Sequence, residues 1–228
     1  QRYQFMREIL SYHHLEYRDE GEFIGDVLTE ISRVKNEQIP LEHFYSSSCG
    51  EEVFRKIYRE YDERLKRNRL IDFDDMLKEC EELLQNNTPQ REYWQKRFSH
   101  ILIDEFQDIN YRQYCIVRLL AERHKNVFAV GDDDQAIYSF RGARPACMQM
   151  FVREFAATQI LLRTNYRSHQ DIVEASLLVI NENLDRFPKI LEASELNQRK
   201  KETYRGTACR VRIKEFRDAP EQMQYLLH

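Results

Sequence analysis

The stretch HILIDEFQDIN, residues 100–110, joins a short apolar run to a group of acidic side chains. The run Ile101–Ile103 has the length and composition of a buried strand. Asp104 and Glu105 follow it directly. Because open parallel sheets bind ligands at the carboxyl ends of their strands, these two carboxylates mark a candidate functional site.

The alternation of apolar runs with helical segments continues along the second half of the chain. The runs are 100–104, 126–131 and 158–163, and the helical segments are 111–124, 144–156 and 168–183. This alternation is typical of an α/β fold with a parallel sheet. Since continuously apolar strands are buried on both sides, we expect helices on both faces of the sheet. The segment 208–216 alternates instead, and is predicted to be a strand with one exposed basic face.

The first hundred residues are predicted to be helical. Segments 51–67 and 72–84 carry apolar side chains at helical spacing, and 1–18 and 22–35 are further helix candidates. The sequence Asn87-Thr88-Pro89 interrupts this pattern. Apolar stripes of this kind usually form a core, and we assign them no chemistry.

Composition indicates a globular chain and excludes several classes of protein. The 228 residues are 42% hydrophobic and 32% charged, which argues against disorder. No apolar stretch approaches the roughly 20 residues of a membrane-spanning helix, and the N-terminus lacks a signal-peptide pattern. The five cysteines are scattered without a CxxC pair, so neither a disulfide framework nor a zinc site is indicated. We therefore expect no membrane partner and a location in the reducing cytoplasm.

Basic residues are concentrated near the C-terminal end. The window 199–217 holds eight basic and two acidic residues, a charge of +6, and leaves −10 for the rest of a chain whose total is −4. One interpretation is a solvated loop and an exposed strand face. The other is a surface that follows a phosphate backbone.

A second acidic group follows the second predicted strand. GDDDQ, residues 131–135, comes directly after the run 126–131. Tips of successive strands in one parallel sheet face the same crevice, where carboxylates are suitable ligands for Mg²⁺. A further acid there could orient and deprotonate a water. The alternative is that these acids only cap strand ends and form turns.

Aromatic and basic residues follow these acidic groups. In IYSFRGA, residues 137–143, Tyr138 and Phe140 would point to the same side if the segment is extended, and exposed aromatics can stack nucleobases. They could instead fill a core. In TNYRS, residues 164–168, Arg167 could bind a phosphate through two hydrogen bonds, or it could be an ordinary surface arginine.

Taken in order, these segments resemble a known family. ILIDEFQD, VGDDDQAIYSFRGA and NYRS, the last followed by NENLDRFPKIL, resemble the second, third and fourth helicase motifs of the UvrD/Rep group of superfamily 1 DNA helicases. IDFDDML (71–77) resembles the segment that precedes the second motif there, and ISRVKNEQI (31–39) a stretch of the inserted helical subdomain. The resemblance covers nearly the whole chain, and three motifs in the right order make it specific.

The resemblance implies a fold and an activity. It implies a partial RecA-like P-loop NTPase sheet preceded by an all-helical inserted subdomain. Residues 1–97 would be part of that subdomain, 98–157 the second half of the first RecA-like domain, and 158–228 the start of the second. The parent protein would be an ATP-dependent helicase or translocase that moves 3′ to 5′, uses ATP and Mg²⁺, and acts on single-stranded DNA and DNA junctions.

The resemblance also implies a role for each motif residue. Asp104 would hold Mg²⁺ and Glu105 would be the general base. Gln135 would sense the γ-phosphate, and Arg167 would be an arginine finger that stabilises charge on the transferring phosphoryl group. The remaining roles concern flat surfaces: Tyr166 would lie against the adenine, and single-stranded DNA would be bound by Tyr138, Phe140 and Arg141.

The family's phosphate loop, with the pattern GxxxxGK[ST], does not occur in the chain. None of the six glycines is followed by a lysine. We therefore expect a window of a longer helicase that hydrolyses ATP negligibly by itself. The alternatives are a non-catalytic module that binds DNA or protein, and the helicase portion of a helicase–nuclease.

Overall fold

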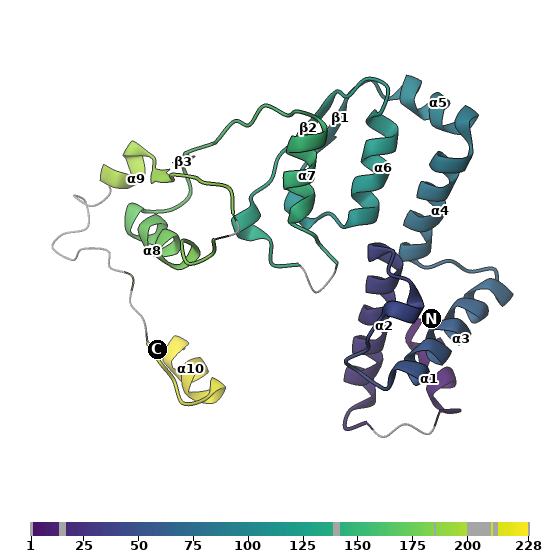
Figure 1. Ribbon diagram of the computed structural model, residues 1–228. Helices are drawn as coiled ribbons and strands as arrows, with labels where there is room; N and C mark the ends of the chain where they lie inside the picture. Colours follow the sequence, from purple (N-terminus) through teal and green to yellow (C-terminus); the bar gives the residue numbers. More distant parts are fainter. Residues whose placement is uncertain are drawn as a thin grey trace. The chain divides into compact units, whose positions relative to one another are not determined.

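The computed structural model describes residues 2–13, 17–138, 142–184, 186–199, 211 and 214–227. These residues form two compact units, Gln1–Thr158 and Gln159–His228. Figure 1 shows the elements of each unit along the chain.

The first unit begins with helices, as predicted. They are α1 (Arg2–Leu10), α2 (Glu20–Glu37), the 3₁₀ turn η1 (Leu41–His43), α3 (Glu51–Arg67), α4 (Phe73–Asn86) and α5 (Thr88–Arg97). The prediction of a helix over 1–18 was too long, because α1 ends at Leu10 and a turn follows. Asn87 ends α4 and accepts a hydrogen bond from the Gln90 amide, which starts α5.

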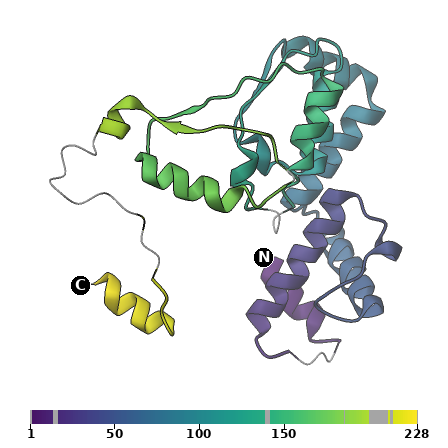
Figure 2. The ribbon, with the colours of Figure 1, turned by 60° about the vertical axis from the view of Figure 1, so that its left-hand side comes forward.

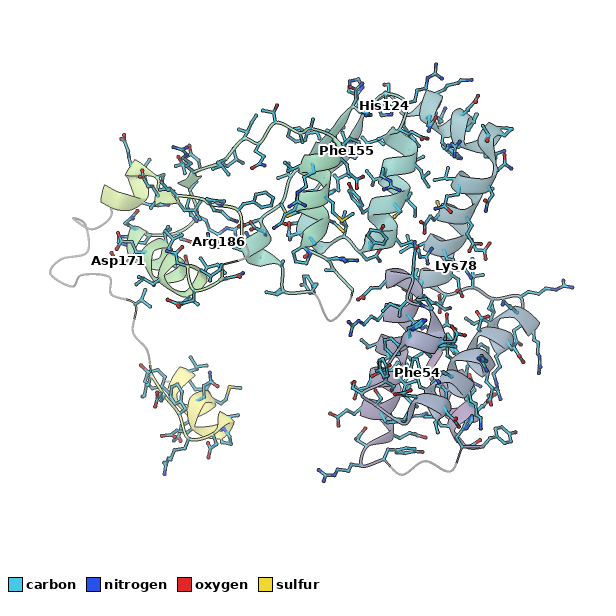
Figure 3. All side chains as sticks on the ribbon, viewed as in Figure 1. Phe54, Lys78, His124, Phe155, Asp171 and Arg186 are labelled. Carbon is cyan, nitrogen blue, oxygen red and sulfur yellow. The ribbon has the colours of Figure 1, made fainter. Side chains whose placement is uncertain are left out.

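The core of this helical part is formed by α1, α2 and α3, which pack against one another in both views (Figures 1 and 2). Its fully buried side chains include Met6, Ile24, Ile31, Phe54 and Ile57. Phe54 lies inside this cluster (Figure 3). The apolar stripe of segment 51–67 therefore forms a core, as expected.

Helix α4 does not follow this rule. Its apolar side chains Met76 and Leu83 are about half exposed, at 52% and 46% of their surface. Its acidic side chains Asp74, Asp75 and Glu81 are buried instead. The prediction of a core-forming stripe is confirmed on this helix only for Leu84, which is 2% exposed, because the buried acids find cationic and amide partners on α2 and on the later helix α6 (Tyr111–Ala121).

The α/β part of the first unit is built on two parallel strands. β1 (Ile101–Ile103) pairs with β2 (Val127–Ala129), with Ile101 opposite Val127 and Ile103 opposite Ala129. The turn η2 (Phe106–Asp108) and α6 (Tyr111–Ala121) connect them, and η3 (Asp133–Gln135) and α7 (Ala146–Glu154) follow. The predicted strands and helices of this region are confirmed to within a few residues.

Helices cover one face of this sheet. Ile103, Val127 and Ala129 pack against a core of Phe106, Tyr114, Cys147 and Phe151, which also receives Phe155 (Figure 3). Leu102 and Phe128 point to the opposite face and are 75% and 60% exposed. The expectation of helices on both faces was therefore wrong for the described residues, because α6 and α7 both lie on the side of Ile103.

The second unit contains a smaller parallel pair. β3 (Thr164–Asn165) pairs with β4 (Glu192–Ala193), and α8 (Gln170–Ile180) lies between them in the chain. α9 (Glu195–Arg199) follows β4, and α10 (Ala219–Leu226) comes later. The prediction of helix 168–183 is confirmed in its central part.

The predicted strand 158–163 was wrong. These residues are irregular, and Ile160 and Leu162 are 78% and 80% exposed. Pairing begins only where the Glu192 amide donates to the Arg163 carbonyl, so no described strand flanks the apolar run. The predicted strand 208–216 lies largely outside the described residues, and its described residues Val211 and Lys214–Phe216 are not in a strand.

The structure also bears on two features of the composition, the lack of a long apolar stretch and the scattered cysteines. Among the described residues, no helix has both the length and the apolar character needed to cross a membrane. The four described cysteines, Cys49, Cys80, Cys115 and Cys147, are free thiols. Burial raises the pKa of Cys147 to about 11, which fits a side chain that belongs to the core.

Candidate functional site

The site begins where β1 ends. The chain leaves the strand through Glu105, which adopts a left-handed conformation with φ 49° and ψ 45°. Asp104 accepts a hydrogen bond from the Glu105 amide at 2.9 Å, and both carboxylates lie on the surface. The Phe106 amide then donates to the Val130 carbonyl, which keeps the turn beside β2.

The end of β2 lies next to this tip. The Val130 amide donates to the Ile103 carbonyl at 2.8 Å, so the two strands end side by side. The carboxylates of Asp132, Asp133 and Asp134 follow, with oxygens within 4.8 Å of one another. Gln135 donates to Asp132 Oδ2 at 2.7 Å. The structure therefore brings the two predicted acidic tips together at one sheet edge.

Gln107 joins the two tips and was missed by sequence reasoning. It is only 2% exposed. Its Nε2 donates to Glu105 Oε2 at 2.7 Å, and its Oε1 accepts from the Asp132 amide at 3.0 Å. The signal was present in the sequence, because Gln107 lies two residues after Glu105, but nothing there showed that the side chain turns inward.

Gly131 lies close to Gln107 and Phe106. A Cβ at this position would lie 2.8 Å from Gln107 Oε1 and 3.2 Å from the Phe106 amide nitrogen. Such a distance to a side-chain oxygen is shorter than real Cβ contacts allow. Glycine therefore permits the close approach of the two strand ends.

Ala143, which follows η3 in the chain, lies beside Asn110 at the start of α6. Tyr138 lies on the surface, and its carbonyl accepts from the Ala143 amide. Ala143 forms an isolated bridge with Asn110, and Gly142 has a φ of 85°. The two other residues predicted to bind DNA, Phe140 and Arg141, lie outside the described residues.

Tyr166 and Arg167 belong to the second unit. Asn165 Oδ1 accepts hydrogen bonds from the amides of Arg167 and Ser168, which forms a tight turn after β3. The Tyr166 carbonyl accepts from Asn197 Nδ2, and the Tyr166 ring is 80% exposed. Both side chains are therefore presented on the surface of this unit by a turn that is fixed at its backbone.

The donor set of the first unit fits a hard cation. Asp104 and Asp132–Asp134 offer carboxylate oxygens, the ligands that Mg²⁺ prefers. Nucleotide phosphates need a further element, because no GxxxxGK[ST] loop occurs in the sequence. The described residues thus offer oxygen ligands of the type that a hard cation prefers, and the sequence supplies no GxxxxGK[ST] phosphate cradle beside them.

Comparison with known proteins identifies a family model and relatives that match the sequence. Residues 3–156 match the model of the UvrD/REP helicase N-terminal domain. The chain is 37% identical over 183 residues to the ATP-dependent DNA helicase PcrA of Bacillus subtilis, which covers 79% of the chain and 25% of that protein. It is 36% identical over 176 residues to the ATP-dependent DNA helicase Rep of Escherichia coli, which covers 76% of the chain and 26% of that protein.

DNA helicase II of Rickettsia typhi is 39% identical over 169 residues, which cover 70% of the chain and 26% of that protein. The chain thus spans about a quarter of the length of the curated relatives it matches. The resemblance seen in the motifs is confirmed, and the chain belongs to the UvrD/REP helicase family.

Proposed function

We propose that this chain is part of an ATP-dependent DNA helicase or translocase that moves 3′ to 5′ along single-stranded DNA. The observation that carries the proposal is the joining of two acidic strand tips at one sheet edge, in a chain of this family. In this proposal, residues 1–97 belong to an inserted helical subdomain, and 98–157 and 158–228 belong to two RecA-like domains.

The acidic tips supply the chemistry in this proposal. Asp104 would hold Mg²⁺, which would neutralise charge on the nucleotide phosphates. Glu105 would accept the proton of the attacking water, and its exposed carboxylate is accessible for that role. Gln135, fixed on Asp132, would contact the γ-phosphate.

The other motif residues would bind flat or charged groups. Tyr138 and Phe140 would stack bases, with Arg141 beside them. Tyr166 would stack on the adenine, and its 80% exposed ring supports this role. Arg167 would stabilise charge on the transferring phosphoryl group, and its loss would leave binding intact while turnover falls by about 10³–10⁵-fold.

The same proposal holds that residues 1–228 by themselves do not turn over ATP. The support is chemical: the printed sequence has no GxxxxGK[ST] loop to hold the β- and γ-phosphates. Phosphate release from the 228-residue chain with saturating single-stranded DNA should stay at background. Robust turnover would contradict this part of the proposal.

The central test is DNA-stimulated ATP hydrolysis by the full-length protein, wild type beside Glu105→Gln. A general base contributes about 10²–10⁴-fold to the rate, so the variant should lose that much while it still binds ATP and DNA. Glu79→Gln, an equal change at an exposed position of α4, is the matched control and should hydrolyse ATP normally. Equal turnover by wild type and Glu105→Gln would refute the assignment of the base.

A further inference from the structure

The side chain of Gln107 has only one orientation that satisfies its surroundings. Its Oε1 faces the Asp132 amide, which can only donate a hydrogen bond. The other end of the amide, Nε2, is therefore the end that faces Glu105 Oε2. A carboxylate can only accept, so a flipped Gln107 would lose both contacts at once.

This contact is the main support of the Glu105 side chain. Within the described part of the chain, Gln107 is the one side chain that donates to the Glu105 carboxylate. Glu105 itself stands on an exposed turn with a left-handed backbone. Long exposed side chains sample several rotamers, so a fixed buried donor is what holds this carboxylate in one place.

The contact also extends to the second tip. Gln107 Oε1 binds the Asp132 amide, and Asp132 Oδ2 binds Gln135 Nε2. A chain of three hydrogen bonds therefore runs from Glu105 through Gln107 and Asp132 to Gln135. A Cβ at position 131 would lie 2.8 Å from Gln107 Oε1, so a side chain there would disturb this chain of hydrogen bonds.

We propose that Gln107 is a positioning residue for ATP hydrolysis, which holds the Glu105 carboxylate and ties it to the strand tip that carries Gln135. This inference rests on the proposed function, in which Glu105 is the general base. Gln107 would not touch the nucleotide in this proposal, because only 2% of its surface is exposed. It acts on the rate of the chemical step through the carboxylate that it holds.

The test uses Gln107→Glu in the full-length protein. Glutamate keeps an oxygen for the Asp132 amide, but it replaces the donor with a second carboxylate that repels Glu105. Since a displacement of about 1 Å can cost about 10²-fold, we expect kcat to fall by about 10–100-fold. The KM for ATP should stay within about threefold of wild type, because no binding group is removed.

A matched control is available on α6. Gln113 also accepts a backbone amide hydrogen bond, from Asn110 at 2.9 Å, and the described hydrogen bonds do not join it to Glu105 or Asp132. Gln113→Glu makes the same chemical change, and glutamate suits this capping position. It should hydrolyse ATP like the wild type.

The deciding measurement is a double-mutant cycle with Glu105→Gln, followed by single-turnover hydrolysis so that slow rates can be measured. If Gln107 acts through Glu105, then Gln107→Glu should cause no further loss in the Glu105→Gln background. Additive losses accompanied by a lower melting temperature would show a merely structural role, and would overturn the inference.

Two further outcomes separate this inference from the proposed function. Wild-type kcat in Gln107→Glu, beside a Glu105→Gln variant that is inactive, would overturn the positioning role alone. Normal turnover in Glu105→Gln would overturn the assignment of the base, and the positioning role with it.

Discussion

The first unit places acidic side chains in two opposite environments. In the helical part, Asp72, Asp75 and Glu81 are buried, and each contacts a cation. At the strand tips, Asp104 and Glu105 are exposed, and among the described residues they accept hydrogen bonds from amide groups. The comparison teaches that a buried carboxylate must be neutralised by the fold itself, whereas an exposed one keeps its charge available for a ligand.

The buried set forms one network between three helices. Lys35 on α2 lies 3.1 Å from Asp72 and 2.6 Å from Asp75, at the start of α4. Arg112 on α6 donates to Glu81 and to the carbonyl of Lys35. Since Lys35 and Asp72 each expose 2% of their side chains, solvent screens this pair very little.

The largest expected effect comes from breaking the buried set. Lys35→Met removes the cation and leaves two buried carboxylates without it, which should lower the free energy of unfolding by about 3–5 kcal/mol. Urea unfolding followed by the fluorescence of Trp94 reports on the first unit, because this is the single tryptophan of the chain. Lys56→Met, at an exposed position of α3, is the control and should shift little. An unchanged midpoint for Lys35→Met would contradict the network.

A smaller effect should come from removing both signs of charge. The triple variant Lys35→Met, Asp72→Asn, Asp75→Asn has no uncompensated carboxylate left, so it should regain about 1–3 kcal/mol over Lys35→Met alone. Asparagine also retains an oxygen for the capping bonds of α4. The same urea titration measures this gain. A triple variant that is less stable than the single one would show that the charges are not what the fold balances.

Acid should remove the stability that the Asp72 carboxylate contributes to the buried set. Burial opposes the ionisation of Asp72, but the Lys35 ammonium and the Asp75 amide hold its pKa below the usual value. A lowered pKa in the folded state adds stability above the unfolded value, near pH 4, and this stability is lost as the pH falls through the folded pKa. The wild type takes up about one more proton on unfolding in this pH range than Asp72→Asn does. The melting temperature of Asp72→Asn should thus fall less steeply than that of the wild type between about pH 5 and pH 2.

The exposed residue Asp26 gives the control for this measurement. Asp26→Asn should retain the wild-type slope of melting temperature against pH. If Asp72→Asn also retained it, the ion pair with Lys35 would not be what stabilises the native state of this chain.

The smallest effect is expected at the strand tips. Asp104→Asn changes an exposed group that has no cationic partner in the described residues, so the free energy of unfolding should stay within about 0.5 kcal/mol of wild type. Chemical unfolding of the 228-residue chain checks this. A loss of more than about 1 kcal/mol would mean that the tip is as structural as the buried network, and the contrast between the two sets would disappear.

The sequence predicted the parts of this molecule that depend on local pattern. The apolar stripe of segment 51–67 predicted a helix, and the apolar runs 100–104 and 126–131 predicted two strands. The structure confirms them as α3, β1 and β2. The sequence also placed Asp104 and Asp132 at the ends of adjacent strands, because parallel strands end at a common edge. These predictions needed only periodicity and one rule of topology.

The features that failed depend on partners distant in the chain. α4 turns its acids inward because Lys35 and Arg112 are there to meet them, and periodicity alone assigns the buried face to the apolar stripe. The run 158–163 is apolar enough for a strand, but the described residues offer it no neighbouring strand. Gln107 was missed for the same reason, since its two contacts exist only once β1 and β2 lie together.

The left-handed backbone of Glu105 has a consequence for selection at this position. A residue with a Cβ pays about 1–2 kcal/mol for that conformation, and glycine avoids most of the cost. Glu105→Gly would relieve that backbone cost, but it would also remove the proposed base and leave the buried Gln107 Nε2 without its acceptor. At position 105 the backbone conformation therefore favours glycine, whereas the hydrogen bond and the proposed chemistry favour glutamate.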